Sequence, residues 1–202
     1  MTLWRSDKPL LLASRSASRQ MLLKNAGIPF EAVPVDIDER GQQEASGLTD
    51  PGQIAEMLAA SKALYAAKHF HMRWILGADQ TLALGNRMFS KPAGRKDAFE
   101  QLKELAGKTH ELHSALAVVR HEDVVWRSVT VARLTMRPLH DDQIEKYLDA
   151  AGDKVTTSVG AYQLEGVGVH LFDKIEGDHF TILGLPLLPL LDFLRSQGLL
   201  AV

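Results

Sequence analysis

The chain has 202 residues, of which 46% are hydrophobic and 24% charged, so it can bury a sizeable core as one large domain or two lobes. Its net charge of −2 argues against an extended nucleic-acid surface but permits a local basic pocket. Because it contains no cysteine, disulfides, thiolate metal sites and cysteine nucleophiles are excluded, which fits a reducing compartment.

The apolar stretches of the chain are short. The N-terminal residues lack the long apolar region and the small-residue cleavage pattern of a signal peptide. The most apolar later stretch, Ile182–Leu194, is too short for a membrane span and contains Pro186 and Pro189. We therefore expect a soluble, cytoplasmic protein with no membrane partner.

The stretch Leu10–Leu23 predicts a strand, a hydroxyl-rich turn and the start of a helix. The first backbone N–H groups of a helix lack partners and carry partial positive charge. Serines together with Arg15 and Arg19 make such a turn suited to phosphate. The alternative is that Ser16 or Ser18 caps a surface helix while both arginines are solvated. These residues alone leave both interpretations open.

The rest of the chain alternates between strand-like and helix-like patterns. Strands are predicted at residues 30–35, 73–78 with a continuation at 81–84, 111–120, 124–134 and 169–172. Helices are predicted at residues 53–69, 97–105, 141–150 and 187–196, with a polar loop at Arg40–Asp50. Crossover helices and a hairpin turn indicate an α/β protein with a mixed sheet. No composition shift marks a linker, so we expect one continuous domain over residues 1–202, with two lobes.

A carboxylate follows the apolar run Arg73–Ala78 directly. Asp79 is thus placed where open α/β sheets expose functional groups, and it could ligate Mg²⁺ or accept a proton from water. The alternative is a residue that caps a turn. Because the next residues continue as a strand, capping is less natural, and we favour a functional role.

Other charged residues suit the same chemistry but are individually ordinary. Asp36, Asp38 and Glu39 follow a predicted strand and offer the oxygen ligands that Mg²⁺ prefers, although a solvated acidic loop is the commoner case. Lys62 on a helix and Lys91 before a proline could each be solvated, and Lys91 could instead neutralise a phosphate. No HExxH, GxxxxGK[ST] or GxGxxG motif is present.

Several different short motifs occur along the chain in a specific order. They are ASRSASRQMLL at 13–23, DIDE at 36–39, SKA at 61–63, GADQ at 77–80, SKP at 90–92, LKELAGKTHELHS at 102–114, GAYQLEGVG at 160–168 and IEGDHFTILGLPL at 175–187. In their order and spacing, the chain resembles the Maf family of nucleoside triphosphate pyrophosphatases from Leu10 to about Leu194.

The resemblance implies an elongated mixed α/β fold, like that of the inosine triphosphatases, with a central cleft between two lobes and often a homodimer. It implies hydrolysis of a nucleoside triphosphate to the monophosphate and pyrophosphate with a divalent cation, Mg²⁺ or Mn²⁺, removing non-standard nucleotides. By motif match, Asp79 resembles the proton acceptor and, with Glu39, the metal-side carboxylates. The phosphate-side positions are Ser14, Arg19, Lys62 and Lys91.

Three positions resemble those that separate the family's subgroups: Ser18, Gln80 and Glu165. The thymidine/uridine triphosphate subgroup carries Arg, Thr and Gln there, and this chain matches none of them. The 7-methyl-GTP subgroup carries an aromatic residue, Gln and Glu, of which Gln80 and Glu165 match and Ser18 departs. A glutamate acceptor pairs with the N1–H and N2–H donors of a guanine edge, so we expect a guanine-like base.

Three alternatives compete with this interpretation. A non-catalytic nucleotide-binding regulator of cell division or septum formation need not keep a water-activating carboxylate, whereas this chain has Asp79. An inosine/xanthosine triphosphate pyrophosphatase would open on a TxNxxK-like turn, which ASRSASR does not match. A domain that binds a partner protein through its 40–50 loop would leave the coincidence of motifs unexplained.

Overall fold

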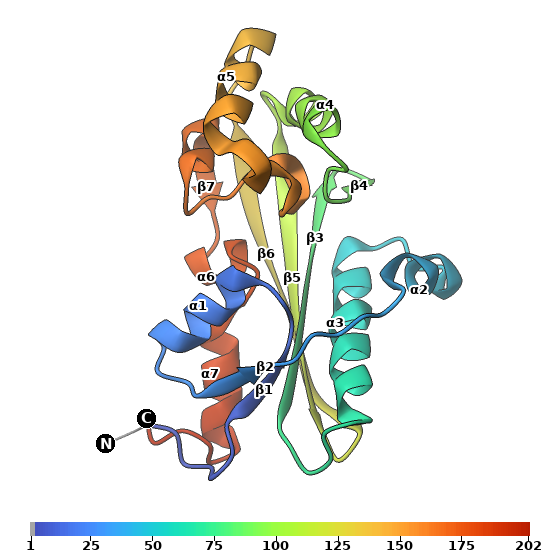
Figure 1. Cartoon of the computed structure of the whole chain (residues 1–202), viewed down its shortest axis with the longest axis vertical. Helices are drawn as coiled ribbons and strands as arrows, with labels where there is room; N and C mark the ends of the chain where they lie inside the picture. Colours follow the sequence, from blue (N-terminus) through green and yellow to red (C-terminus); the bar gives the residue numbers. More distant parts are fainter. Residues whose placement is uncertain (1–2) are drawn as a thin grey trace. The chain divides into compact units, whose positions relative to one another are not determined.

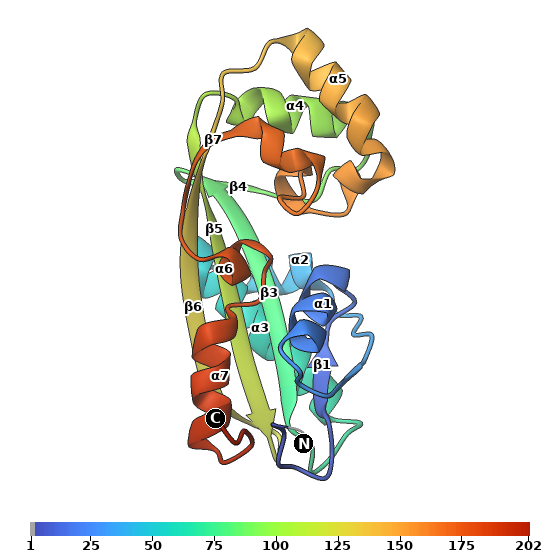
Figure 2. The same cartoon turned by 90° about the vertical axis from the view of Figure 1, so that its left-hand side faces the viewer.

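Residues 3–202 are described by a computed structural model, in which seven strands form one mixed sheet flanked by helices (Figures 1 and 2). The strands are β1 (Leu10–Ala13), β2 (Phe30–Ala32), β3 (Ile75–Leu84), β4 (Arg87–Phe89), β5 (Thr109–Arg120), β6 (Asp123–Met136) and β7 (Phe172–Glu176). The helices are α1 (Ala17–Asn25), α2 (Glu39–Ser46), α3 (Pro51–Ala67), α4 (Arg95–Leu105), α5 (Asp141–Ala151), α6 (His179–Ile182) and α7 (Leu187–Ser196), with 3₁₀ helices η1 (Gly152–Thr156), η2 (Val159–Ala161) and η3 (Val167–Leu171). The predicted α/β class is confirmed.

The sheet combines parallel and antiparallel pairs. Its order is β2-β1-β3-β5-β6-β7, and β4 pairs with β3. β1 runs parallel to both β2 and β3, whereas β4 and β7 pair antiparallel with β3 and β6. Parallel neighbours need crossover connections, which here contain α1 on one side and α3 on the other. The chain therefore leaves β1 toward one neighbour and later returns on the opposite side of it.

The chain divides into two units. The first contains the described residues up to Gln80 together with Ser114–Thr130 and His179–Val202, and the second contains Thr81–His113 and Val131–Asp178. Three of the four dividing points fall inside β3, β5 and β6, so each of these strands contributes to both units, and the fourth lies between β7 and α6. The prediction of one continuous domain stays a prediction. None of the helices formed by residues 3–202 has the length and apolar character that crossing a bilayer requires.

In the first unit, helices cover both faces of the sheet, as Figure 1 shows for α1 and α7 on one side and α3 on the other. Alternate residues of β1 point to opposite faces. Leu10 and Leu12 pack in the core that includes α1 and α7, whereas Leu11 packs with alanines of α3. Both faces of β1 are buried, which explains its uninterrupted apolar sequence.

Close packing of α3 against β3 depends on one glycine. A Cβ atom at Gly77 would lie 2.0 Å from the backbone oxygen of Ala59, so only glycine lets the helix approach the strand this closely. The facing helix surface consists of alanines for the same reason. Lys62 lies on this helix, and because the helix packs so close to β3, its side chain reaches the strand.

At the starts of α1 and α3, a side-chain oxygen caps the first turn of the helix. The Ser16 hydroxyl accepts a hydrogen bond from the Arg19 backbone N–H at 3.4 Å, at the start of α1. The Asp50 carboxylate accepts one from the Gln53 N–H at 2.8 Å, with Pro51 in the first turn of α3. The capping role of Ser16 therefore stands, and it does not exclude a ligand at the same turn.

The prediction of a polar loop at Arg40–Asp50 is wrong, because α2 occupies Glu39–Ser46. Asp38 caps this helix by accepting from the Gly41 N–H at 2.8 Å, and Gly47 ends it with a positive φ of 65°. α2 buries no residue, so it has no apolar stripe from which a helix could be recognised.

The predicted strand over Val169–Phe172 is also wrong. The 3₁₀ helix η3 covers Val167–Leu171, and the strand β7 begins only at Phe172. The sequence VGVHL alternates in hydrophobicity like a strand, but Gly168 packs tightly against Gln163, where a Cβ would lie 2.4 Å from the backbone oxygen. Local packing of the glycine-rich segment thus overrides the strand pattern.

The second unit buries an imidazole in its core. His110 is fully buried on β5, and its Nε2 lies 2.7 Å from the Tyr162 hydroxyl oxygen. The hydroxyl of Tyr147 on α5 donates to the backbone oxygen of Ala161 at 3.0 Å. Burial lowers the pKa of His110 to about 4. These contacts tie the segment that leads to Glu165 to the sheet and to α5.

Candidate active site

The candidate site lies where β1 ends and β3 continues. Ala13, the last residue of β1, pairs with Gly77, and β3 runs on to Leu84. Asp79 therefore lies two residues beyond the last β1 partner, inside a longer strand rather than at its end. Because β1 has its crossover connections on opposite sides, this position corresponds to the switch point at which open α/β sheets bind ligands.

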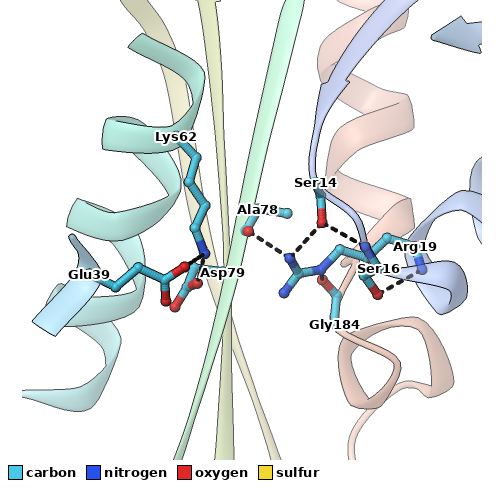
Figure 3. A network of polar contacts seen from close by, with 8 residues as sticks. All are labelled: Ser14, Ser16, Arg19, Glu39, Lys62, Ala78, Asp79 and Gly184. Atoms are coloured by element: carbon cyan, nitrogen blue, oxygen red, sulfur yellow. Dashed lines mark hydrogen bonds and ion pairs between the residues drawn. The ribbon is translucent and has the colours of Figure 1, made fainter. Parts of the chain in front are cut away.

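One cluster on the α3 side of β3 consists of two carboxylates and an ammonium group. Lys62 Nζ lies 2.5 Å from Asp79 Oδ1 and 2.8 Å from Glu39 Oε1 (Figure 3). The side chains of Asp79 and Lys62 are 9% and 12% exposed, whereas that of Glu39 is 52% exposed. Within residues 3–202, Asp79 Oδ2 has no hydrogen-bond partner, so this oxygen is left to interact with water or a cation.

A second cluster holds the guanidinium of Arg19 at the turn after β1. Its Nε donates to the Gly184 backbone oxygen at 2.8 Å, and its Nη1 donates to the Ala78 oxygen at 2.7 Å and to Ser14 Oγ at 3.2 Å (Figure 3). Ser14 Oγ also accepts from the Ser16 backbone N–H at 3.2 Å. With two donors already directed at this oxygen, the Ser14 hydroxyl hydrogen is left to donate outward.

Gly184 must be glycine for this arrangement. Its φ is +82°, and a Cβ there would lie 3.3 Å from Arg19 Nε. The two anchoring carbonyls leave Nη2 of the guanidinium without a hydrogen-bond partner among residues 3–202. Arg19 therefore presents the N–H groups of this one nitrogen in a fixed direction, which suits a charge-assisted hydrogen bond to an anion.

The two clusters lie on either side of β3, as Figure 3 shows. Alternation along the strand explains this, since Asp79 points toward α3 while Ala78 packs in the core on the α1 side. Burial lowers the pKa of Arg19, and the nearby charges of Asp79 and Glu39 act in the opposite direction. The two clusters thus interact electrostatically through the strand.

The Gln80 side chain is oriented by its neighbours. Its Nε2 lies 3.0 and 3.1 Å from the backbone oxygens of Thr181 and Ile182 and 2.7 Å from Ser114 Oγ. The Ser114 hydroxyl donates its hydrogen bond to the backbone oxygen of Thr181 at 2.7 Å. Because backbone oxygens only accept, Nε2 must face them, and the acceptor Oε1 must point the other way.

The remaining predicted residues are distributed over both units. Ser18 lies half-buried in the first turn of α1, in the first unit. Lys91 and Glu165 belong to the second unit, where both are exposed, in the segment after β4 and in the turn between η2 and η3. The structure thus brings together Ser14 with Arg19, and Glu39 with Lys62 and Asp79; the roles of all these residues stay predictions.

Sequence reasoning missed the groups that hold the predicted residues in place. The backbone oxygens of Ala78 and Gly184 orient Arg19, and the buried Ser114 and Thr181 orient Gln80. A backbone oxygen has no signature in the amino-acid sequence, since every residue has one. For Gly184, the signal was its place in GLP before α7, which was noticed only as part of a motif.

Comparison with known proteins gives consistent matches over nearly the whole chain. A family model described as Maf-like protein matches residues 9–197. A protein of Rhodopseudomonas palustris named nucleoside triphosphate pyrophosphatase is 65% identical over 202 residues, covering 100% of both chains. One of Bradyrhizobium diazoefficiens with the same name is 59% identical over 202 residues, again covering 100% of both. A 7-methyl-GTP pyrophosphatase of Rhizobium meliloti is 51% identical over 195 residues, covering 95% of this chain and 98% of its own.

Proposed function

This chain belongs to the Maf-like family and is a nucleoside triphosphate pyrophosphatase, and we propose that Asp79 activates the attacking water and that the preferred base is guanine-like. The products are then a nucleoside monophosphate and pyrophosphate. The observation that carries the proposal is the buried carboxylate of Asp79, with Oδ1 held by Lys62 and Oδ2 left open, at the switch point of the sheet. A relative that carries the name of an enzyme and matches over 100% of both chains favours catalysis over a non-catalytic regulator of cell division.

In the proposed reaction, water attacks the α-phosphorus of the triphosphate. An oxygen–phosphorus bond forms, the bond from the α-phosphorus to the bridging oxygen breaks, and pyrophosphate leaves with that oxygen. Asp79 Oδ2 accepts the proton released by the water. The water oxygen is then a stronger nucleophile as it attacks the phosphorus. The ammonium of Lys62 fixes the other oxygen, so the carboxylate keeps its orientation.

Negative charge grows on the leaving pyrophosphate, and cations must stabilise it. Lys62 uses two of its three N–H donors on carboxylates, which leaves one for a phosphate oxygen. The Nη2 of Arg19 and the hydroxyl hydrogen of Ser14 are free for the same purpose. Lys91 is proposed as a further counter-charge for the phosphates.

The acidic cluster of Asp79 and Glu39 suits a divalent cation. Asp79 and Glu39 with Lys62 carry a net charge of −1, and both carboxylates reach the same ammonium group. Residues 3–202 contain no group of three or more His, Cys, Asp or Glu side chains suited to a metal. Two carboxylates completed by phosphate oxygens and water is the usual arrangement for Mg²⁺. Glu39 and Asp79 would hold the ion, which when bound neutralises phosphate charge.

The base preference rests on two acceptors. Gln80 Oε1 points away from its protein partners, and Glu165 offers an exposed carboxylate. A guanine edge supplies two adjacent donors, N1–H and N2–H, whereas uracil and thymine supply only one. Sites that hydrogen-bond such donors reject bases lacking them strongly. The relative named 7-methyl-GTP pyrophosphatase supports this preference, although Ser18 offers no ring to stack on a methylated base.

Pyrophosphate release from a panel of nucleotides tests this proposal. The panel contains GTP, 7-methyl-GTP, dTTP, UTP and ATP, each with Mg²⁺. We expect kcat/KM for the two guanine nucleotides to exceed that for dTTP and UTP by at least tenfold, because one lost hydrogen-bond pair costs about 1.4 kcal/mol or more. Preference for dTTP or UTP would overturn the base assignment, and absence of any turnover would overturn the activity.

A further inference from the structure

A buried glutamine in the second unit has no place in the mechanism above. We propose that Gln101 is a positioning residue for Lys91, and that together with Asp97 it fixes the backbone on both sides of this lysine. The inference rests on the proposed role of Lys91 toward the phosphates. The contacts that carry it lie inside the second unit alone, around the start of α4.

Gln101 holds the backbone immediately before the lysine. Its side chain lies on α4 and the residue is only 8% exposed, which is unusual for a glutamine. Its Nε2 donates to the backbone oxygen of Ser90 at 3.1 Å and approaches Asp97 Oδ2 at 3.4 Å. The oxygen of Ser90 belongs to the peptide bond that connects it to Lys91, so this contact fixes the entry to the lysine.

Asp97 holds the backbone after the lysine. Its Oδ2 accepts a hydrogen bond from the Ala93 N–H at 2.9 Å, and the intervening Pro92 is buried. Lys91 itself is exposed. The lysine therefore stands between two fixed points, with a proline whose ring also restricts the residue before it.

The amide of Gln101 is fixed at a cost in stability. Both partners of Nε2 are oxygens that only accept, so the amide cannot be flipped. Its Oε1 is consequently buried without a hydrogen-bond partner among the described residues. An unmet buried acceptor destabilises a protein, and an apolar side chain of the same length would avoid it. The glutamine is therefore explained better by what its Nε2 holds than by packing.

Holding the backbone matters because lysine is long and flexible. Its ammonium group samples many positions around four rotatable bonds, and a mobile attachment point would enlarge that volume further. Fixing residues 90 and 93 restricts the ammonium to one region, where it can meet a bound phosphate more often. A charge that binds the phosphates equally before and during reaction acts mainly on KM.

The test is a double-mutant cycle between Gln101→Met and Lys91→Ala, measured as kcat and KM for pyrophosphate release from GTP with Mg²⁺. Methionine keeps the size of glutamine and removes the donor. We expect Gln101→Met to raise KM about tenfold with kcat changed less than twofold, and to leave the thermal midpoint unchanged or higher. In the Lys91→Ala background the same change should alter KM less than twofold. Glu100→Met, at the neighbouring exposed position of α4, is the matched control and should leave both kcat and KM unchanged.

The outcomes separate the inference from the proposed function. An equal effect of Gln101→Met in both backgrounds would show a structural role and overturn the inference. A Lys91→Ala variant with impaired KM beside an unaffected Gln101→Met variant would overturn the inference and leave the proposed function intact. Unchanged kinetics of Lys91→Ala would overturn the role of Lys91 and the inference with it. If Gln101→Met does not fold, Asp97→Ala, at an exposed residue, is carried through the same cycle.

Discussion

Asp79 and Lys62 place opposite charges against each other in a poorly hydrated setting, and Glu39 contributes a second, exposed carboxylate to the same ammonium. A buried ion pair that loses one partner usually destabilises the fold, because the other charge is left without compensation. Here Lys62 keeps Glu39 when Asp79 is neutralised. Activity and folding can therefore be separated by mutation at this site.

Replacing Asp79 with asparagine should abolish water activation without unfolding the protein. The amide keeps the size of the carboxylate but cannot accept the proton, so we expect kcat to fall by about 10²–10⁴-fold or more. Pyrophosphate release and the circular dichroism spectrum are the measurements. Asp192→Asn makes the same change at an exposed carboxylate on α7 and should keep full activity. A folded Asp79→Asn variant with parental turnover would rule out the proposed role.

His110 should make the stability of the protein sensitive to acid. Its pKa is about 4 in the fold and about 6.5 in an unfolded chain, so between these values the unfolded state binds the extra proton. The free energy of unfolding should therefore fall as the pH falls from 6.5 to 4, by about 3 kcal/mol from this group. Urea unfolding of the parent and of His110→Gln at several pH values measures it. The variant should lose less stability over this range, and an identical pH dependence would contradict the assignment.

At the scale of elements, the sequence predicts those whose local signals agree with their packing. The strand β1, the helix α3 and the helix α7 were recognisable from apolar runs, caps and periodicity. The helix α2 was not predicted because none of its residues is buried. The 3₁₀ helix η3 was not predicted because the close packing of Gly168 determines the backbone path there.

Some residues of the candidate site could likewise be predicted from the sequence, and others could not. Asp79 was recognisable because a charge after an apolar strand is unexpected, and Arg19 because it accompanies serines at a helix start. The carbonyl anchors of Arg19 and the amide of Gln101 were not recognisable. Their roles depend on contacts between residues that lie 59 and 165 positions apart, or on which atom of a side chain faces the backbone.

The hairpin between β5 and β6 carries strain that substitution should relieve. His121 and Glu122 have φ values of 52° and 67°, although side chains disfavour this region. Asparagine and glycine suit such a two-residue turn, so His121→Asn/Glu122→Gly should raise the free energy of unfolding by about 1 kcal/mol. Loss of the exposed His71–Glu122 contact costs little. Chemical denaturation measures the change, with Gly85→Ala, at φ 59°, as a control that should destabilise.

At the scale of the whole molecule, the residues predicted to act on the nucleotide belong to different units. Ser14, Arg19 and Lys62 belong to the first, and Lys91 and Glu165 to the second. The long strands β3, β5 and β6 contribute residues to both. The homodimer implied by the family resemblance stays a prediction.

Metal and nucleotide should stabilise the molecule together rather than separately. The protein offers two carboxylates that already share Lys62, so a divalent cation should bind firmly only when phosphate oxygens complete its ligands. We expect Mg²⁺ to raise the thermal midpoint in the presence of a non-hydrolysable triphosphate and to change it little alone. EDTA should abolish turnover, and renewed Mg²⁺ should restore it. Equal stabilisation by Mg²⁺ without nucleotide would contradict this prediction.

The anchoring of Arg19 by two backbone oxygens has a consequence for divergence among related sequences. A side-chain partner is lost with a single substitution, whereas the oxygen of Ala78 remains whatever side chain replaces it, provided the strand keeps its path. Of the two anchors, only Gly184 is constrained, by its positive φ of +82° and by the 3.3 Å that a Cβ would leave to Arg19 Nε. We propose that Arg19 binds the triphosphate, and substitutions at the surrounding positions should therefore leave its orientation unchanged. The neighbouring positions can change with the substrate while its orientation persists.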